Sequence, residues 1–184
     1  MTSGPPMEAP VLLTPRLRLR PRTIHDLEAN LAMDLDPDVQ QFVFVHGPPD
    51  PVAHRAELIE KIARGWPQPE GALWTVEALE TPGFLGWCAV FPLQNSGLIE
   101  LGYRYARPAW GRGIATEAGG AVLGHAFDQL GIDPVVGVTH PANRRSRRVL
   151  EKLGFRYQGL AWYYDTHLAF YRQGRDQYQA RRRD

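Results

Sequence analysis

The feature that most constrains the fold is a strand-like segment, residues 98–105, followed by a glycine-rich stretch and a helix-like segment that runs to about Leu130. Residues 107–118 read Arg-Pro-Ala-Trp-Gly-Arg-Gly-Ile-Ala-Thr-Glu-Ala. Gly111, Gly113 and Ala115 leave the backbone N–H groups at the start of the helix uncovered by large side chains. Because a helix N-terminus carries about half a positive charge and several unpaired donors, the stretch predicts a site for a pyrophosphate or a similar anion.

Two common phosphate-binding patterns do not fit this stretch. The dinucleotide fingerprint needs a glycine at its sixth position, and the sixth residue from Gly111 is Thr116. The nucleotide P-loop ends in Gly-Lys-Ser/Thr, and the stretch contains no lysine. The pattern Gln/Arg-x-x-Gly-x-Gly/Ala is matched by Gly113 and Ala115, with Trp110 in the Gln/Arg position. This match resembles the acyl-CoA pyrophosphate loop of the GNAT N-acetyltransferases, and the version here resembles their ribosomal-protein (RimJ/RimL-like) branch.

Further segments extend the resemblance over about Leu12 to Gln173. Residues 14–21 alternate leucine with arginine, as a half-buried strand does, and resemble the opening of that branch. Residues 36–39, Asp-Pro-Asp-Val, resemble the helix start that follows it. Residues 143–155 contain Asn143, Ser146 and a closing Gly-Phe pair, which resemble the branch's Asn-x-x-Ser helix and its exit into a late strand.

Periodicity and turn signals predict the order of the elements. The expected strands are 12–20, 72–79, 84–91, 98–105, 134–139, 155–164 and 167–173. The expected helices are 23–33, 51–64, 116–130 and 143–153, with irregular chain at 36–49 and a loop at 65–71. Short turns join the strands between 72 and 105, so an antiparallel meander is expected there. Together with the resemblance, this predicts an α/β fold: a mixed, largely antiparallel central sheet flanked by helices on both faces, the acyl-CoA N-acyltransferase fold.

Length and composition narrow the class of protein. A chain of 184 residues fits one domain, expected over 12–178, with a flexible tail at 1–11 and a basic tail at 179–184. A net charge of +1 gives no general case for a nucleic-acid or membrane partner, and no apolar run approaches the ~20 residues of a membrane span. Residues 1–10 lack the features of a secretory signal, so a cytoplasmic protein is expected. The single cysteine, Cys88, and six histidines without ligand spacing predict no metal site.

The resemblance implies acetyl-CoA as co-substrate and assigns residues to it. The backbone of 111–115, with the Thr116 hydroxyl, would hold the pyrophosphate, and the backbone of 103–107 would pair with the pantetheine arm. Asn143 matches a position that hydrogen-bonds the pantetheine, although its local pattern is also that of a plain helix N-cap. The expected cofactor-binding residues are Tyr103, Tyr105, Ala106, Arg107, Gly111, Arg112, Gly113, Ile114, Ala115, Thr116, Asn143 and Ser146.

Acyl transfer to an amine needs a base for the ammonium and a group that meets the leaving thiolate. Glu100 is the candidate base, because it is a carboxylate in an apolar strand where burial would raise its pKa. The alternative is a carboxylate on a wet face or paired with Arg104. Leu150 stands where many GNAT enzymes have a tyrosine acid. This departure moves the role to Ser146, whose hydroxyl would stabilise the thiolate rather than protonate it.

The expected reaction is acetyl transfer to a primary amine, on a protein N-terminus or a small molecule, by direct attack in a ternary complex. Cys88 lies in an earlier strand and is expected to be a buried structural thiol. His167 and Tyr171, on the last strand, either touch the acceptor or pack. The run 162–164, Trp-Tyr-Tyr, packs in the sheet or forms a homodimer surface. The rival functions are a catalytically idle acyl-CoA-binding module and a ribosome- or RNA-associated protein that uses the arginine clusters at 144–148 and 181–183.

Overall fold

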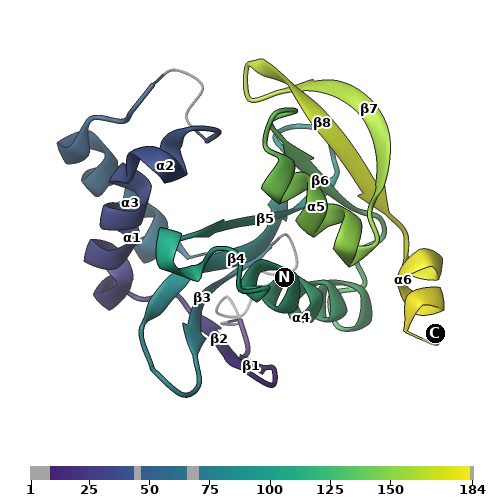
Figure 1. Ribbon diagram of the computed structural model, residues 1–184, viewed down its shortest axis with the longest axis horizontal. Helices are drawn as coiled ribbons and strands as arrows, with labels where there is room; N and C mark the ends of the chain where they lie inside the picture. Colours follow the sequence, from purple (N-terminus) through teal and green to yellow (C-terminus); the bar gives the residue numbers. More distant parts are fainter. Residues whose placement is uncertain (1–8, 44–46, 66–70, 183–184) are drawn as a thin grey trace, which may run out of the picture.

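The computed structural model describes residues 9–43, 47–65 and 71–182, and their strands form one sheet (Figure 1). The strands are β1 (Leu12–Leu13), β2 (Leu17–Pro21), β3 (Ala72–Ala78), β4 (Phe84–Pro92), β5 (Ile99–Tyr105), β6 (Val135–Thr139), β7 (Arg156–Tyr163) and β8 (Thr166–Gln173). Their order across the sheet is β1-β2-β3-β4-β5-β6-β8-β7. All neighbours pair antiparallel except β5 and β6, which are parallel, so the expected mixed, largely antiparallel sheet is confirmed.

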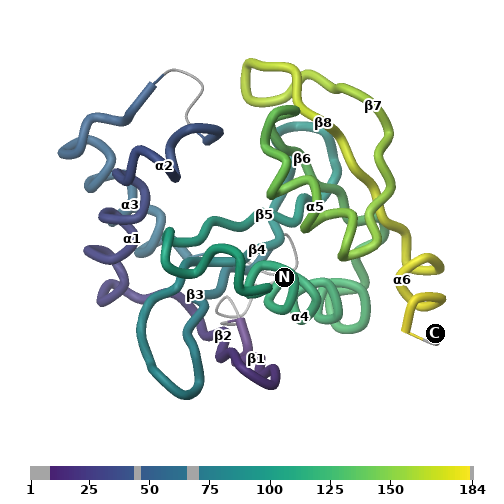
Figure 2. The backbone as a smooth tube through the Cα atoms, viewed as in Figure 1, coloured from purple at the N-terminus to yellow at the C-terminus, as the bar shows by residue number. Residues whose placement is uncertain are grey.

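Helices cover both faces of the sheet. They are α1 (Leu27–Leu35), α2 (Pro37–Gln40), α3 (Pro51–Arg64), α4 (Ile114–Asp128), α5 (Arg144–Leu153) and α6 (Arg175–Arg181), with 3-10 turns η1 (Ile24–Asp26) and η2 (Arg107–Ala109). Successive strand residues point to opposite faces. On β5, Arg104 contacts Asp34 of α1, whereas Tyr103 contacts Ser146 of α5, so α1 and α5 lie on opposite sides. Figure 2 shows the N-terminal helices and the β7–β8 hairpin on opposite sides of the central strands.

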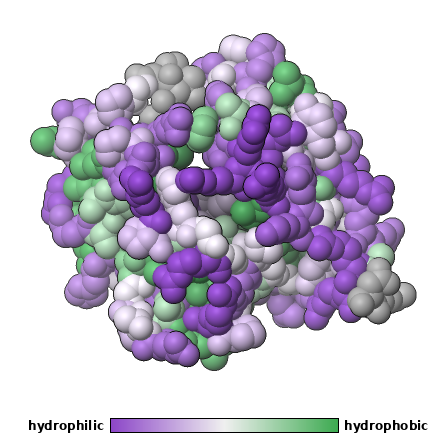
Figure 3. All heavy atoms as spheres, viewed as in Figure 1, coloured by the Kyte–Doolittle hydropathy of each residue, from purple (hydrophilic) through white to green (hydrophobic). Residues whose placement is uncertain are grey.

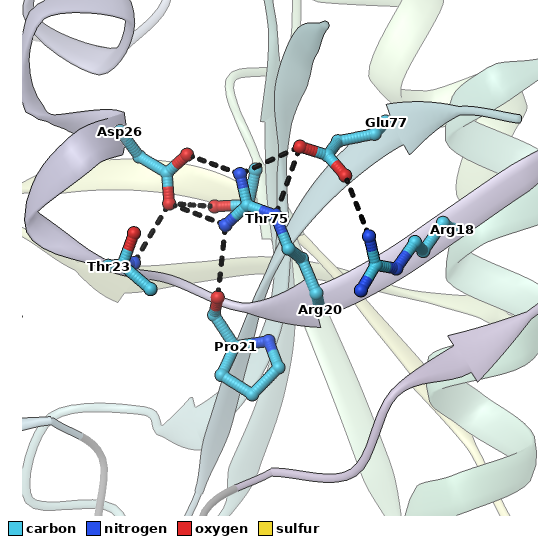
Figure 4. A network of polar contacts seen from close by, with 7 residues as sticks. All are labelled: Arg18, Arg20, Pro21, Thr23, Asp26, Thr75 and Glu77. Carbon is cyan, nitrogen blue, oxygen red and sulfur yellow. Dashed lines mark hydrogen bonds and ion pairs between the residues drawn. The ribbon is translucent and has the colours of Figure 1, made fainter. Parts of the chain in front are cut away.

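The alternation in β2 decides which side chains enter the core. Leu17 and Leu19 are almost fully buried against α4, whereas Arg20 points to the other face. There its guanidinium donates to both carboxylate oxygens of Asp26 (2.9 and 2.7 Å) and to Glu77 of β3 (Figure 4). Asp26 also accepts the Thr75 hydroxyl at 3.0 Å. This buried network fixes the start of the N-terminal helices to the sheet, next to the cleft described below.

The structure moves several expected boundaries. The strand predicted at 12–20 is two strands, because a turn in which Thr14 N–H donates to the Leu17 carbonyl separates them. The helix predicted at 23–33 begins as η1 and continues to Leu35, and the helix predicted at 116–130 runs from 114 to 128. The segment 36–49, expected to be irregular, contains α2, which agrees with the helix start that residues 36–39 resemble; its N-cap Asp36 accepts the Asp38 N–H at 2.9 Å.

Parts of the predicted tails and loops lie outside the described residues, namely 1–8, 44–46, 66–70 and 183–184. Helix α6 includes 179–181 of the segment expected to be a basic tail. The division into a domain and two tails stays a prediction. Within the described part of the chain, no helix combines the length and apolar character needed to cross a membrane.

Candidate active site

A cleft opens where β5 and β6 separate. The two parallel strands pair only at Ile99 with Val135 and at Glu100 with Val136. Beyond this point residues 101–105 stay paired with β4, while their other edge leaves β6. The cleft has a volume of about 470 Å³ and is lined by β4, β5, the N-terminal helices, the end of β6, α5 and the β7–β8 turn. Figure 3 shows this face hollowed between the two sides of the molecule.

The glycine-rich loop follows the C-terminal end of β5, which is the end that no longer pairs with β6. Gly111 and Gly113 both adopt a left-handed backbone, with φ values of 73° and 77°, which favours glycine at both positions. Gly113 is the N-cap of α4, and the first hydrogen bond of the helix joins Glu117 N–H to the Gly113 carbonyl at 3.0 Å. The amides of residues 114–116 therefore precede the first helical bond. A Cβ placed on Gly111 would meet no atom of the described residues within 4 Å, so among these residues nothing blocks an anion at this point of the loop.

Trp110 fills the Gln/Arg position of the loop pattern and is held by two contacts. Its indole N–H donates to the Tyr105 carbonyl at 2.7 Å, and the Arg145 guanidinium lies 4.9 Å from the ring centroid. The indole therefore anchors the loop to the end of β5 and to α5. A flexible polar side chain at this position would not provide the same packing.

The N-terminal segment supports the loop from outside, a contact that sequence analysis missed. The Thr14 hydroxyl and the Arg16 backbone N–H donate to one oxygen of Glu117, at 2.6 and 3.0 Å. The Arg16 side chain donates to the other oxygen at 2.7 Å and to the Arg112 carbonyl at 3.1 Å. Two of the segments that carry the family resemblance therefore contact each other, and their polar side chains fix the first turn of α4.

Glu100 lies at the point where β5 and β6 diverge. It is 6% exposed, and its carboxylate accepts the Tyr164 hydroxyl at 2.9 Å and a backbone hydrogen bond from Val138. Burial raises the pKa of Glu100 to about 8, because the loss of water outweighs these two hydrogen bonds. The alternatives of a carboxylate on a wet face or paired with Arg104 are wrong, since Glu100 is buried and its hydrogen-bond partners are Tyr164 and Val138.

The opposite wall of the cleft brings together three polar residues of β5 and the start of α5. Asn143 accepts the Ser146 N–H at 3.1 Å, so the expected N-cap is confirmed, and both residues line the cleft. The Ser146 hydroxyl lies 3.0 Å from the Tyr103 hydroxyl, which also contacts the Ser146 carbonyl at 3.1 Å. Burial raises the pKa of the Tyr103 hydroxyl above its ordinary value. Leu150 also lines the cleft, where it packs as a buried apolar residue.

The remaining candidate residues, at the end of β5 and in the loop that follows it, differ in burial and in their partners. Tyr105 is buried in the core, the Ala106 N–H donates to the Leu85 carbonyl at 2.9 Å, and the Arg107 side chain pairs with Asp38. Ile114 is buried beneath the loop, whereas Arg112 is exposed.

Of the candidates near the end of the chain, Tyr164 contacts Glu100, whereas His167 and Tyr171 lie outside the cleft. His167 is exposed and packs edge-on against Trp162, at 5.0 Å between ring centroids, and Tyr171 is fully buried, where it accepts from Arg147 at 2.9 Å. Neither is among the described residues that line the cleft. Tyr164, expected only to pack or to form a dimer surface, instead reaches Glu100.

Cys88 is fully buried as expected, and burial raises its pKa to about 12. Within the described residues, no group of three or more His, Cys, Asp or Glu side chains could hold a metal ion.

On the side of the N-terminal helices, the cleft contains a buried polar network centred on Asp34, which is 1% exposed. Its carboxylate accepts from Arg104 at 2.6 Å and from Asn30 at 2.9 Å, and His54 Nε2 lies 2.9 Å away. Arg22 donates to Asn30 Oδ1 at 3.2 Å. No motif in the sequence connects these residues, because they come from three separate segments of the chain.

Comparison with known proteins identifies the family of this chain and proteins of similar sequence. Residues 16–156 match the family described as an acetyltransferase (GNAT) domain. YkkB of Bacillus subtilis, an uncharacterized protein, is 34% identical over 102 residues, which are 54% of this chain and 59% of YkkB. The chain thus spans less than two thirds of YkkB. The uncharacterized N-acetyltransferase YoaA of Bacillus subtilis is 28% identical over 152 residues, 82% of this chain and 85% of YoaA.

Solved structures share the architecture. An acetyltransferase from Agrobacterium tumefaciens superposes with a TM-score of 0.77 at 27% identity, covering 95% of this chain and 100% of that one. Aminoglycoside acetyltransferase AAC(6′)-Ib in complex with coenzyme A gives 0.74 at 18% identity, over 90% and 99% of the two chains. Mycobacterium smegmatis RimJ in complex with CoA-disulfide gives 0.67 at 21% identity, over 87% and 82%. The last two likenesses are of fold alone.

Proposed function

This chain belongs to the GNAT acetyltransferase family, whose members are acetyl-CoA-dependent, and on that basis we propose that it acetylates a primary amine by direct attack in the cleft between β5 and β6. One observation carries this proposal: a buried carboxyl, Glu100, lies where the two strands part and lines the same cleft as the polar start of α5. Resemblance to the RimJ/RimL-like branch is part of the proposal, and RimJ shares the fold.

The residues present fit acetyl-CoA. The amides of 113–116 and the open space over Gly111 suit a pyrophosphate, because unpaired helix N-terminal donors and the helix dipole favour an anion. The unpaired edge of 101–105 suits the peptide-like pantetheine arm by strand-type hydrogen bonding. Asn143 lines the cleft beside this edge, and its helix-capping bond uses only Oδ1. When bound, the co-substrate supplies an acetyl thioester. The protein's own groups orient it, accept a proton from the amine and stabilise charge on the leaving sulfur.

Glu100 is proposed as the base that takes a proton from the incoming ammonium. Its raised pKa of about 8 makes its ionised form a stronger proton acceptor than an ordinary carboxylate. The Tyr164 hydroxyl, which donates to Glu100, positions the carboxylate. Cys88 lies fully buried in β4 with a raised pKa, which supports direct attack over a cysteine nucleophile.

Ser146 is proposed to stabilise negative charge on the leaving sulfur. Its hydroxyl, from α5, and that of Tyr103, from β5, form a hydrogen-bonded pair at 3.0 Å. Because both groups hold their protons firmly at neutral pH, they donate a hydrogen bond rather than a proton. Position 150 is a leucine and supplies no hydroxyl to the leaving sulfur. The Tyr103 hydroxyl, which hydrogen-bonds Ser146 from β5, offsets part of this loss.

The acceptor is proposed to be a primary amine, either a protein N-terminus or a small molecule, and the cytoplasmic location stays a prediction. The direct test mixes the protein with acetyl-CoA and a panel of N-terminal peptides and small amines, and measures free thiol together with the N-acetylated product. Amine-dependent thiol release with a matching product is expected. Coenzyme A binding without transfer to any amine would favour an idle binding module. Strongly salt-dependent RNA binding with no response to acetyl-CoA would favour the RNA-associated alternative.

A further inference from the structure

Arg22 presents to the cleft a guanidinium that forms no ion pair with any carboxylate of the described residues. It directly follows β2, is half-buried and lines the side of the cleft formed by the N-terminal helices. Among the residues that the structure describes, its one hydrogen bond is from Nη1 to Asn30 Oδ1, at 3.2 Å, and no carboxylate lies within ion-pair distance. Arg20, two residues earlier, pairs with both Asp26 and Glu77.

The two carboxylates whose charges act on Arg22, Asp26 and Asp34, have other hydrogen-bond partners. Asp34 is shared among Arg104, Asn30 and His54, so Arg22 reaches it only through the Asn30 side chain. Glu57, further along the same wall, pairs with Lys61. Removing a guanidinium from water without a paired counter-ion is unfavourable, and burial lowers the pKa of Arg22 although the charges of Asp34 and Asp26 act the other way. An anionic group on a ligand would remove that cost.

We propose that the acceptor amine carries a carboxylate that pairs with Arg22 while its amine lies at Glu100; this inference rests on the proposed acetyl transfer. A guanidinium offers parallel N–H donors that match the two oxygens of a carboxylate, and the remaining donors of Arg22 are available for such a pair. Between the two ends the cleft is lined by the apolar side chains of Leu73, Trp87 and Phe91, which suit a hydrocarbon or peptide spacer.

The strand register sets the length of that spacer. Pro21 of β2 pairs with Trp74, Trp74 with Cys88, and Cys88 with Tyr103 of β5. Arg22 therefore lies three strands from β5, and strands are spaced about 4.8 Å apart, so the two backbones are about 14 Å apart across the sheet. Glu100 lies three residues along β5 from Tyr103, which adds about 10 Å along the strand direction. An α-amino acid, whose amine and carboxylate share one carbon, is too short to reach both ends. The geometry suits an ω-amino acid or a short peptide with a free C-terminal carboxylate.

The test compares each acid with its neutral amide. The substrates are 6-aminohexanoate with 6-aminohexanamide, and triglycine with triglycinamide, so that the two pairs distinguish an ω-amino acid from a peptide. The proteins are wild type, Arg22→Gln, Arg22→Lys, which keeps the charge, and Arg18→Gln as a matched control. Arg18 lies on β2, the strand that Arg22 directly follows, is half-exposed and does not line the cleft. The readouts are kcat/KM for each amine and KM for acetyl-CoA.

Wild type should prefer the acid of at least one pair by about 10- to 100-fold, the range for a charge-assisted pair. Arg22→Gln should reduce the ratio to about one without changing KM for acetyl-CoA, Arg22→Lys should keep part of it, and Arg18→Gln should leave it intact. Equal kcat/KM for acid and amide in wild type, or an unchanged ratio in Arg22→Gln, would overturn the inference.

Binding of the N-acetylated products decides the same question without turnover. N-acetyl-6-aminohexanoate, N-acetyl-triglycine and their amides are titrated into the protein with coenzyme A present. Binding that favours the acid and is lost in Arg22→Gln would support the carboxylate site even if none of these amines were acetylated, in which case only the proposed transfer to them would fail. Absence of any preference for the acids in both assays would reject the carboxylate site while leaving transfer to other amines untouched.

Discussion

Replacing Glu100 by glutamine separates the role of this carboxyl in stability from its role in catalysis. The pKa of Glu100 is about 8 in the folded protein, against 4.5 for an ordinary glutamate. Between these values the folded state keeps a proton that the unfolded state has lost. The free energy of unfolding of the wild type therefore falls as pH rises from 4.5 to 8. Glutamine has the shape of the protonated acid and does not titrate, so the variant escapes this loss.

The size of the effect follows from the shift. Each pH unit of the window is worth about 1.4 kcal/mol. The variant should therefore match the wild type near pH 4.5, exceed its stability by about 3 kcal/mol at pH 7, and exceed it by about 5 kcal/mol above pH 8. Urea unfolding at about pH 5, 7 and 9 measures the difference. The exposed Glu80→Gln is the control, and its stability should stay within about 0.5 kcal/mol of the wild type throughout.

Glu100→Gln should lower catalytic activity even though it raises stability. Loss of a general base should lower kcat by about 10²- to 10⁴-fold with little change in KM for acetyl-CoA. In the wild type kcat/KM should rise with pH through about 8, because the ionised form of Glu100 accepts the proton. The variant should lack this step, although higher pH should partly rescue it as more acceptor amine becomes neutral. Wild-type turnover across the pH range in a folded Glu100→Gln protein would refute the assignment, and a variant less stable than wild type at pH 7 would refute the burial argument.

Three other substitutions test the remaining parts of the site. Ser146→Ala removes one donor to the leaving sulfur, so it should cost roughly tenfold to a hundredfold in kcat with no rescue by pH, and a loss as large as that of Glu100→Gln would contradict the division of roles. Arg16→Ala removes the side-chain contacts to Glu117 and Arg112, so calorimetry should show weaker coenzyme A binding by about tenfold with kcat nearly unchanged. Cys88→Ala should keep most of the activity in the thiol-release assay, and abolished turnover in a folded variant would point to a covalent route.

The sequence predicted the fold well where a local pattern decides it. Alternating Leu17 and Leu19 mark β2, the spaced turns of 72–105 produce the antiparallel meander, and Asn143 does cap its helix. The boundaries that moved depend on local geometry that periodicity does not record, such as the turn at Thr14. The apolar strand neighbours of Glu100 left burial and a wet face both open, because a strand alternates between two faces, and the structure shows Glu100 buried.

Contacts between distant segments could not be predicted in this way. Tyr164 donates to a carboxylate 64 residues earlier in the chain, and Arg16 reaches a glutamate 101 residues later. The charge on Arg22 becomes informative only when Asp34 is seen to be occupied by other partners. Polar pairs of this kind depend on the folded topology, since neither partner has a pattern in its own segment that names the other.

The central claim, that the loop after β5 holds the pyrophosphate of acetyl-CoA, is tested most directly by calorimetric titration of coenzyme A into wild type, Gly113→Val and Gly131→Val. Gly113 and Gly131 have similar positive φ values, 77° and 67°, but Gly131 follows the far end of α4, so it controls for backbone strain. Valine at 113 should displace at least two donors to a charged acceptor, each worth roughly 1.5–3 kcal/mol. The account predicts affinity lowered on the order of a hundredfold in Gly113→Val alone, and near-normal affinity in that folded variant would contradict it.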